Sequence, residues 1–138
     1  MNKTNILFIC RYNRFRSRVA EAYFNKINKN KNIKAKSAGV FKGSPLNKIQ
    51  IKEAKSSGID ISGKPTGISS QLLKWQNLIV IVADDVPPIL FGDNKKYGKK
   101  LIVWKVTDSK NDNKKNVEKI IKSIMLKVNQ LNKELNKK

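Results

Sequence analysis

The chain has 138 residues, of which 39% are hydrophobic, so it can close one hydrophobic core, and we expect a single domain over residues 1–138. Thirty Lys and Arg against ten Asp and Glu give a formal net charge of +20, which first suggests a nucleic acid or another anionic partner. The one cysteine, Cys10, excludes an internal disulfide and zinc sites built on cysteine pairs, and the absence of histidine excludes Ser-His-Asp, Cys-His and His-metal chemistry.

Short apolar runs alternate with helical patterns along the first half of the chain. Residues 5–10 are an apolar run typical of a strand buried on both faces. Apolar side chains then recur at helical spacing over residues 17–27, with Ser17 as a favourable N-cap. Residues 33–37 form a second strand candidate, and the apolar spacing from 44 to 58 predicts a helix with proline in its first turn.

The second half of the chain repeats this alternation. Residues 69–75 predict a short helix, 78–83 are the most strand-like segment, and 101–106 indicate a fourth strand. A long helix is expected over 117–135, where the apolar side chains fall on one stripe. Strands that alternate with helices imply right-handed crossovers. We therefore expect an α/β fold of three layers, with a four-stranded parallel sheet and helices on both faces.

The segment between the first strand and the first helix carries the most specific charges. Four arginines are confined to eight positions: Arg11, Arg14, Arg16 and Arg18. The other 30 − 4 = 26 cations are lysines spread over the whole chain, which we interpret as solvated background. Cys10 lies where backbone N–H groups and a positive helix terminus bind anions, at the carboxyl end of a strand. Such surroundings, together with nearby arginine, favour the thiolate form of a cysteine.

The spacing of Cys10, five residues, Arg16 and Ser17 fits phosphoryl transfer to cysteine. Five intervening residues can wrap into a cradle whose amides point at the phosphate oxygens, while Arg16 supplies two parallel charge-assisted bonds. The Ser17 hydroxyl can donate to the leaving thiolate. The sequence contains neither GxxxxGK[ST] nor GxGxxG after a strand. The candidate phosphate-binding residues are Arg11, Tyr12, Asn13, Arg14, Phe15, Arg16 and Ser17.

This segment resembles the low-molecular-weight protein tyrosine phosphatases. Their signature is a hydrophobic strand, then Cys-x5-Arg-Ser, then a helix that starts with Ala-Glu-Ala, here residues 20–22. The resemblance continues through Ser-Ala-Gly at 37–39, through residues 58–62 and through the strand that ends at 83–84. It covers almost the whole chain in order, and it implies the fold expected above with a phosphatase P-loop after the first strand.

The resemblance implies a role for each residue of the loop. Cys10 would be the nucleophile that forms a phosphocysteine intermediate, and Arg16 would clamp the phosphate. Asn13 would fix the unusual backbone of the loop, Ser17 would stabilise the thiolate, and Ser37 would support the loop from the end of the second strand.

The general acid of these phosphatases is an aspartate in an Asp-Pro loop before the last helix. Asp108 stands at that position, followed by serine where proline is usual. We prefer Asp108 to Asp112, Asp84 and Asp85, because it follows the fourth strand and so belongs to the same sheet edge as Cys10. Asp108 would protonate the leaving oxygen and later activate water. Asp84 is interpreted as a loop or helix-start residue.

Several positions depart from the family pattern. Tyr12 replaces the usual glycine, Phe15 the second cysteine of the loop, and Arg18 the usual proline, while Lys64 stands near where many relatives have histidine. Without a second cysteine, no neighbouring disulfide can protect the oxidised nucleophile, and the thiol relay of a thioredoxin-coupled arsenate reductase is missing. Phe41, just after Ser-Ala-Gly, can form an aromatic wall for a phenyl ring.

Two functional hypotheses follow. The first is a cysteine-dependent phosphatase, without metal or cofactor, that acts as a monomer on a phosphotyrosine protein or a small aryl phosphate. The second is a non-catalytic module of the same fold that uses the loop and the net charge of +20 to hold nucleic acid nonspecifically or an acidic partner. No apolar run approaches the roughly 18 residues of a membrane span. We therefore expect no membrane partner, and a cytoplasmic location for the free thiol.

Overall fold

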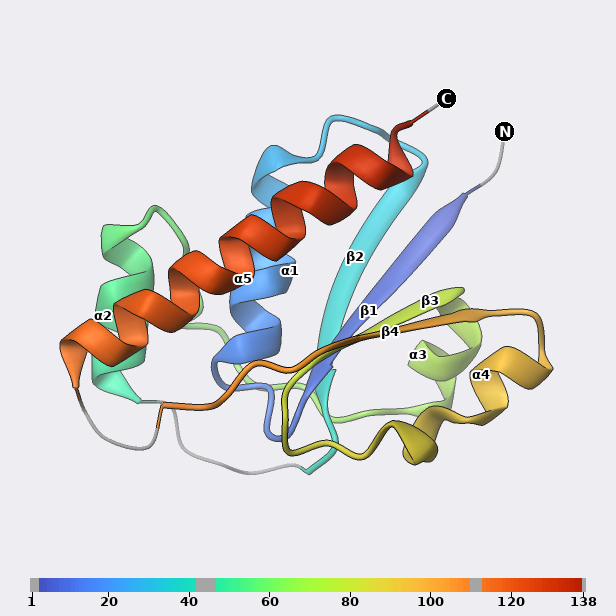
Figure 1. Ribbon diagram of the computed structural model, residues 1–138, viewed down its shortest axis with the longest axis horizontal. Helices are drawn as coiled ribbons and strands as arrows, with labels where there is room; N and C mark the ends of the chain where they lie inside the picture. The colour runs from blue at the N-terminus through green and yellow to red at the C-terminus, as the bar shows by residue number, and fades with distance from the viewer. Residues whose placement is uncertain (1–2, 42–46, 110–112, 138) are drawn as a thin grey trace.

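The structure is a computed structural model that describes residues 3–41, 47–109 and 113–137. Its centre is a parallel sheet in the order β2-β1-β3-β4 (Figure 1). The strands are β1 (Thr4–Cys10), β2 (Ile33–Gly39), β3 (Leu78–Val82) and β4 (Lys100–Trp104). The helices are α1 (Arg16–Ile27), α2 (Lys48–Ser56), α3 (Ser70–Trp75), α4 (Asp93–Lys96) and α5 (Lys114–Leu135), with a 3-10 helix η1 (Pro88–Phe91). The expected α/β fold with a four-stranded parallel sheet is confirmed.

The two faces of the sheet pack into two separate hydrophobic clusters, because successive side chains of a strand point to opposite faces. Phe8 of β1 and Val80 of β3 belong to the cluster that also contains the apolar side chains of α1, α2 and α5. Leu7 and Ile79 belong to the other cluster, with apolar residues of α3 and η1. The sheet is therefore covered on both sides, which explains why β3 reads as an uninterrupted apolar run.

Helix α5 follows the predicted pattern closely. Its inward stripe is buried against α1, α2 and the sheet, with Ile121, Ile124 and Val128 fully inaccessible to solvent. Figure 1 shows α5 running across α1 and α2 along one side of the molecule. The interpretation of this stripe as core is confirmed.

Some element boundaries differ from the sequence-based expectation. The expected start of α2 at residues 44–45 lies outside the described residues, and the helix begins at Lys48, where the Asn47 side chain accepts hydrogen bonds from two backbone amides. Strand β4 ends at Trp104 instead of residue 106, and η1 and α4 were not predicted. Ser17 as N-cap was wrong, because α1 begins at Arg16 and Phe15 occupies the cap position without a side-chain bond.

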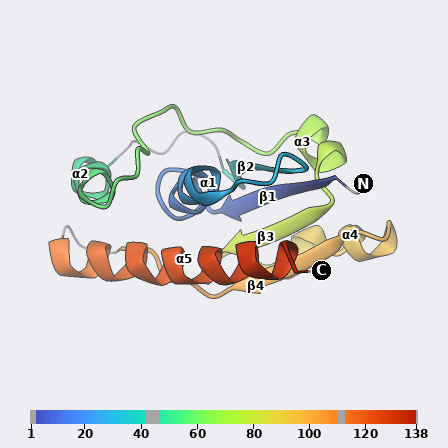
Figure 2. The ribbon, with the colours of Figure 1, turned by 90° about the horizontal axis from the view of Figure 1, so that it is seen from above.

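The carboxyl ends of β1, β3 and β4 lie at the same edge of the sheet. The arrowheads of β1 and β3 point the same way in Figure 2, and the pairs Ile9–Ile81 and Ile81–Val103 fix the register of the three strands. Parallel strands end together at such an edge, so the segments that follow β1, β3 and β4 meet there. This edge holds the site described next.

Candidate active site

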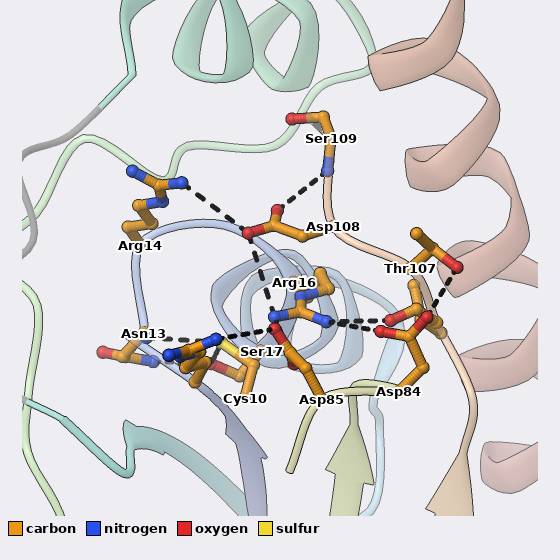
Figure 3. A network of polar contacts seen from close by, with 12 residues as sticks. Cys10, Asn13, Arg14, Arg16, Ser17, Asp84, Asp85, Thr107, Asp108 and Ser109 are labelled. Atoms are coloured by element: carbon orange, nitrogen blue, oxygen red, sulfur yellow. Dashed lines mark hydrogen bonds and ion pairs between the residues drawn. The ribbon is translucent and has the colours of Figure 1, made fainter. Parts of the chain in front are cut away.

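The P-loop joins β1 to α1 and buries its only thiol. Cys10 is 2% exposed, and its Sγ lies 2.9 Å from the Ser17 Oγ and accepts a hydrogen bond of 3.3 Å from the Asn13 amide. The loop therefore turns back so tightly that the start of α1 contacts the end of β1 (Figure 3). The Asn13 amide donates to the sulfur, and in the contact with Ser17 either the Cys10 thiol or the Ser17 hydroxyl can be the donor.

Asn13 connects the loop to two more distant segments. Its backbone has φ 56°, a left-handed conformation that Asn adopts more readily than most residues. Its amide group donates 2.8 Å to the Ser17 Oγ and 2.9 Å to the Ser37 Oγ, and its carbonyl oxygen accepts 2.8 Å from the Thr66 amide. The structure thus brings together Asn13, Ser17 and Ser37, the three residues expected to support the loop.

Glu21 continues this chain of hydrogen bonds and was missed by sequence reasoning. The Ser37 hydroxyl donates a short hydrogen bond to the Glu21 carboxylate, on the first turns of α1. Burial raises the pKa of Glu21, while the Ser37 hydrogen bond and the charges of Arg18 and Lys36 act in the opposite direction. Glu21 belongs to the Ala20-Glu21-Ala22 pattern of the sequence. That pattern indicates a helix start and the family resemblance, but not a hydrogen bond to Ser37.

Arg16 is the most enclosed cation of the site. It is 2% exposed, its Nη1 donates 2.9 Å to the Val106 carbonyl, and its Nη2 donates 2.9 Å to the Asp85 Oδ1. The Asp84 Oδ1 lies 3.7 Å from its Nη1. Asp84 also accepts 2.8 Å from the Thr107 hydroxyl, which fixes that carboxylate. The interpretation of Asp84 as a mere loop residue missed that the two carboxylates after β3 pair with the arginine of the loop.

Asp108 lies near the Arg16 guanidinium, on the same side of the P-loop as Asp85 (Figure 3). Its Oδ1 accepts 2.9 Å from the Ser109 amide, and its Oδ2 is 3.8 Å from the Arg16 Nη2 and 3.6 Å from the Arg14 Nη2. Asp112, the alternative acid in the same segment, lies outside the described residues. The carboxylate of Asp108 is therefore close to the guanidinium expected to hold the phosphate, and its role as general acid stays a prediction.

The remaining residues of the loop divide into an inner and an outer set. Phe15 is 1% exposed and part of the core, so only its backbone can face a phosphate. Arg11, Tyr12 and Phe41 form the outer rim of the P-loop. The Phe41 ring is 6.1 Å from that of Tyr12, and Phe41 is 53% exposed. The Phe41 amide donates 2.9 Å to the Arg11 carbonyl and so ties the aromatic side chain to the loop.

The described residues hold neither a metal-binding cluster nor a membrane-spanning helix. In residues 3–41, 47–109 and 113–137, no group of three or more Cys, Asp or Glu side chains is arranged to hold a metal ion. Over the same ranges, no helix has the length and apolar character needed to cross a membrane.

Comparison with known proteins decides the family. The family model described as low molecular weight phosphotyrosine protein phosphatase matches residues 5–138. The chain belongs to this family. A search of curated proteins finds no match to the sequence.

Solved structures share the fold of this phosphatase family member over nearly its whole length. A low molecular weight protein tyrosine phosphatase from T. tengcongensis has 25% identity and a TM-score of 0.82, covering 96% of this chain and 99% of its own. The YwlE arginine phosphatase from Geobacillus stearothermophilus has 19% identity and a TM-score of 0.80, covering 96% and 92%. An arsenate reductase from Archaeoglobus fulgidus has 24% identity and a TM-score of 0.72, covering 92% and 98%. Membership of the family supports a phosphatase, and the neighbours span several substrates.

Proposed function

We propose that the chain is a cysteine-dependent phosphatase that hydrolyses phosphotyrosine or aryl phosphomonoesters through a phosphocysteine. The observation that carries the proposal is the geometry around Cys10, whose buried Sγ has Ser17 Oγ at 2.9 Å and the Asn13 amide at 3.3 Å. These donors suit a sulfur that must act as a thiolate and leave as one. A structural cysteine in a strand would need neither.

In the first chemical step, the Cys10 thiolate attacks phosphorus, the P–S bond forms and the bond from phosphorus to the phenolic oxygen breaks. Arg16 binds two oxygens of the transferred group, with the loop amides around the others. To do so, its guanidinium exchanges part of its contact with Asp85 for the phosphate. Asp108 delivers its proton to the leaving oxygen, and its Oδ2 at 3.8 Å from Arg16 is within reach of a group bound there.

In the second step, water attacks the phosphorus of the phosphocysteine. The Asp108 carboxylate, now deprotonated, takes a proton from that water, and the P–S bond breaks. The electron pair returns to sulfur, where the Ser17 hydroxyl donates to the thiolate. Inorganic phosphate leaves, and both residues are back in their initial states.

The rim of the site favours an aryl phosphate over the other substrates of the structural neighbours. Phe41 and Tyr12 offer aromatic surface beside the P-loop. Arg11 and Arg14 stand at the same rim and would repel the cationic leaving group of a phosphoarginine. Arsenate reduction through a thiol relay needs further cysteines, and the sequence has one. A reducing compartment such as the cytoplasm keeps this thiol active.

The proposal is tested by measuring hydrolysis of a phosphotyrosine peptide and of an aryl phosphate by the wild type and four variants. We expect Cys10→Ser to abolish turnover and Asp108→Asn to lower kcat on the order of 100 to 10,000-fold. Asp85→Asn tests Asp85 as the alternative proton donor. If Asp108 is the general acid, Asp85→Asn should lower kcat less than Asp108→Asn does. Asp93→Asn, an exposed aspartate of α4, is the matched control and should keep full activity.

The outcomes separate the hypotheses. Absence of turnover in the wild type, or full turnover in Cys10→Ser, would reject the phosphatase and leave the non-catalytic phosphate-binding module. A larger loss in Asp85→Asn than in Asp108→Asn would reassign the general acid. Phosphoarginine, offered as a parallel substrate, should be hydrolysed more slowly than phosphotyrosine.

A further inference from the structure

Two residues that depart from the family pattern, Arg18 and Lys64, line the same hollow beside the P-loop. The hollow has a volume of about 360 Å³, and its third cation is Lys36 of β2. Asn13 and Ser37, which support the P-loop, also line it. The proposed nucleophile, phosphate clamp and general acid are not among its lining residues. The hollow is therefore a separate place where cations from distant segments meet.

The cations of the hollow outnumber its acidic groups. Glu21 is the one carboxyl in the described lining, and it accepts the Ser37 hydroxyl. Burial raises the pKa of Glu21, which favours its neutral form, while the charges of Arg18 and Lys36 act in the opposite direction. Within the described residues, no carboxylate lies within 4.0 Å of the side-chain nitrogens of the three cations. An anion can thus approach them without displacing an ion pair.

Arg18 is a half-buried cation whose charge is incompletely compensated. Burial lowers the pKa of its guanidinium, while the more distant charges of Glu21, Asp60 and Cys10 act in the opposite direction. Its Nη2 lies against Gly63, where an added Cβ would be only 2.7 Å away. The absence of a side chain at this position leaves room for the guanidinium at the edge of the hollow.

Lys36 is oriented by an aromatic ring. Its Nζ lies 4.7 Å from the centroid of Trp75, at the end of α3. Such a contact positions an ammonium group without neutralising its charge. Lys64, on the segment before α3, is exposed. Three separate segments, α1, β2 and the one before α3, therefore each contribute a cation to the hollow.

We propose that this hollow binds a small multivalent oxyanion, with Arg18, Lys36 and Lys64 as its ligands. A guanidinium presents paired N–H donors that match the oxygens of a phosphate or sulfate, and the two ammonium groups add point charges. Free phosphate and the phosphate group of a small monoester offer the same chemistry. Binding here does not depend on the proposed phosphatase activity, because the three cations lie outside the P-loop.

The experiment resolves the two anion sites by ¹H–¹⁵N NMR of the intact chain, titrated with sulfate at constant ionic strength. The backbone amides of Gly63 and Thr66 report on the hollow, and those of the P-loop report on the phosphoryl site. We expect saturable shifts at the hollow. Arg18→Gln combined with Lys64→Gln should weaken binding there by about tenfold and leave the affinity measured at the P-loop unchanged.

Two further variants separate the site from folding and from the overall field of the protein. Lys36→Gln combined with Lys64→Gln removes two exposed side chains, leaves Arg18 in place, and should weaken binding at the hollow in the same way. Lys29→Gln combined with Lys31→Gln removes the same charge beyond the end of α1 and should leave both affinities intact.

Inorganic phosphate and glycerol phosphate, titrated in the same way, distinguish the sources of the anion. Tighter binding of glycerol phosphate at the hollow identifies a monoester, and equal or weaker binding identifies the free ion. Absence of saturable shifts at the hollow, unchanged affinity there in both test variants, or an equal loss in the lysine control would overturn the proposal. Shifts confined to the hollow, with no response at the P-loop, would count against the proposed function and keep this site.

Discussion

At the scale of single residues, the P-loop is held by a continuous chain of side-chain hydrogen bonds. It runs from the Cys10 Sγ to Ser17, from Ser17 to Asn13, from Asn13 to Ser37, and from Ser37 to Glu21. One end of this chain is the sulfur of the proposed nucleophile, and the other is a largely buried carboxyl. The charge state of Glu21 is therefore linked to the orientation of the hydroxyls and amide that position the thiol.

Glu21→Gln tests this end of the chain. Burial raises the pKa of Glu21 above its ordinary value of 4.5, so the folded state favours the protonated carboxyl. The resulting stability is fully present below pH 4.5 and is lost as the pH rises through the raised value of the folded protein. Gln keeps an oxygen for Ser37 and cannot ionise, so the variant should gain stability relative to wild type as the pH increases.

Urea unfolding from pH 4 to pH 8 measures the effect, with Glu134→Gln at an exposed position of α5 as the matched control. A stability of Glu21→Gln that falls relative to wild type as the pH rises would contradict the assigned direction of the shift.

At the scale of elements, the end of β2 and the loop after β1 approach so closely that only glycine fits between them. A Cβ atom added to Gly39 would lie 2.6 Å from the Tyr12 carbonyl carbon and 2.7 Å from the Asn13 nitrogen. Real Cβ atoms essentially never approach backbone atoms so closely. The Ser-Ala-Gly at the end of β2 therefore determines how the loop can lie over the sheet.

Gly39→Ala should displace the loop at Tyr12 and Asn13. We expect kcat/KM for an aryl phosphate to fall by on the order of 100-fold, because a misplacement of about 1 Å in a reacting group costs that much. Gly92→Ala is the matched control, since its added Cβ would meet only the Ile89 carbonyl oxygen at 3.4 Å. Unchanged kinetics in a folded Gly39→Ala protein would show that the approach of β2 does not position the loop.

The sequence predicts the elements well where hydrophobic spacing is long or uninterrupted. The stripe of α5 and the apolar runs of β1 and β3 lead to the right elements, because burial of one stripe or of two faces leaves a simple pattern. The short η1 and α4 were not predicted, because each has only four residues and so shows no hydrophobic periodicity. Asp85 and Glu21 also escape, because their importance arises from packing between segments distant in the chain.

At the scale of the whole molecule, the net charge of +20 divides into a local and a distributed part. The arginines of the loop meet Asp84, Asp85 and Asp108 within 4 Å, so the site itself is close to electrical balance. The 30 − 4 = 26 lysines supply most of the excess and are spread along the chain. We expect their field to attract anions weakly, nucleic acid among them.

Duplex DNA binding tests the interpretation that the lysines are solvated surface charges with no specific binding role. The affinity should fall steeply as salt increases, become weak at physiological ionic strength, and show no sequence preference, in the wild type and in Cys10→Ser alike. A fluorescence titration of a labelled duplex over a range of salt concentrations measures it. Tight binding to one sequence at physiological salt would instead support the nucleic-acid module.

The phosphocysteine is the species on which the proposed function depends. Asp108→Asn should slow its hydrolysis and let it accumulate, so enzyme of this variant is mixed with an aryl phosphate, quenched in acid and analysed by mass spectrometry of its peptides. The account predicts one phosphoryl group on the peptide that contains Cys10, and none on the same peptide of the double variant with Cys10→Ser. A protein that hydrolyses the aryl phosphate while this peptide stays unmodified, or carries the phosphoryl group on another residue, would contradict it.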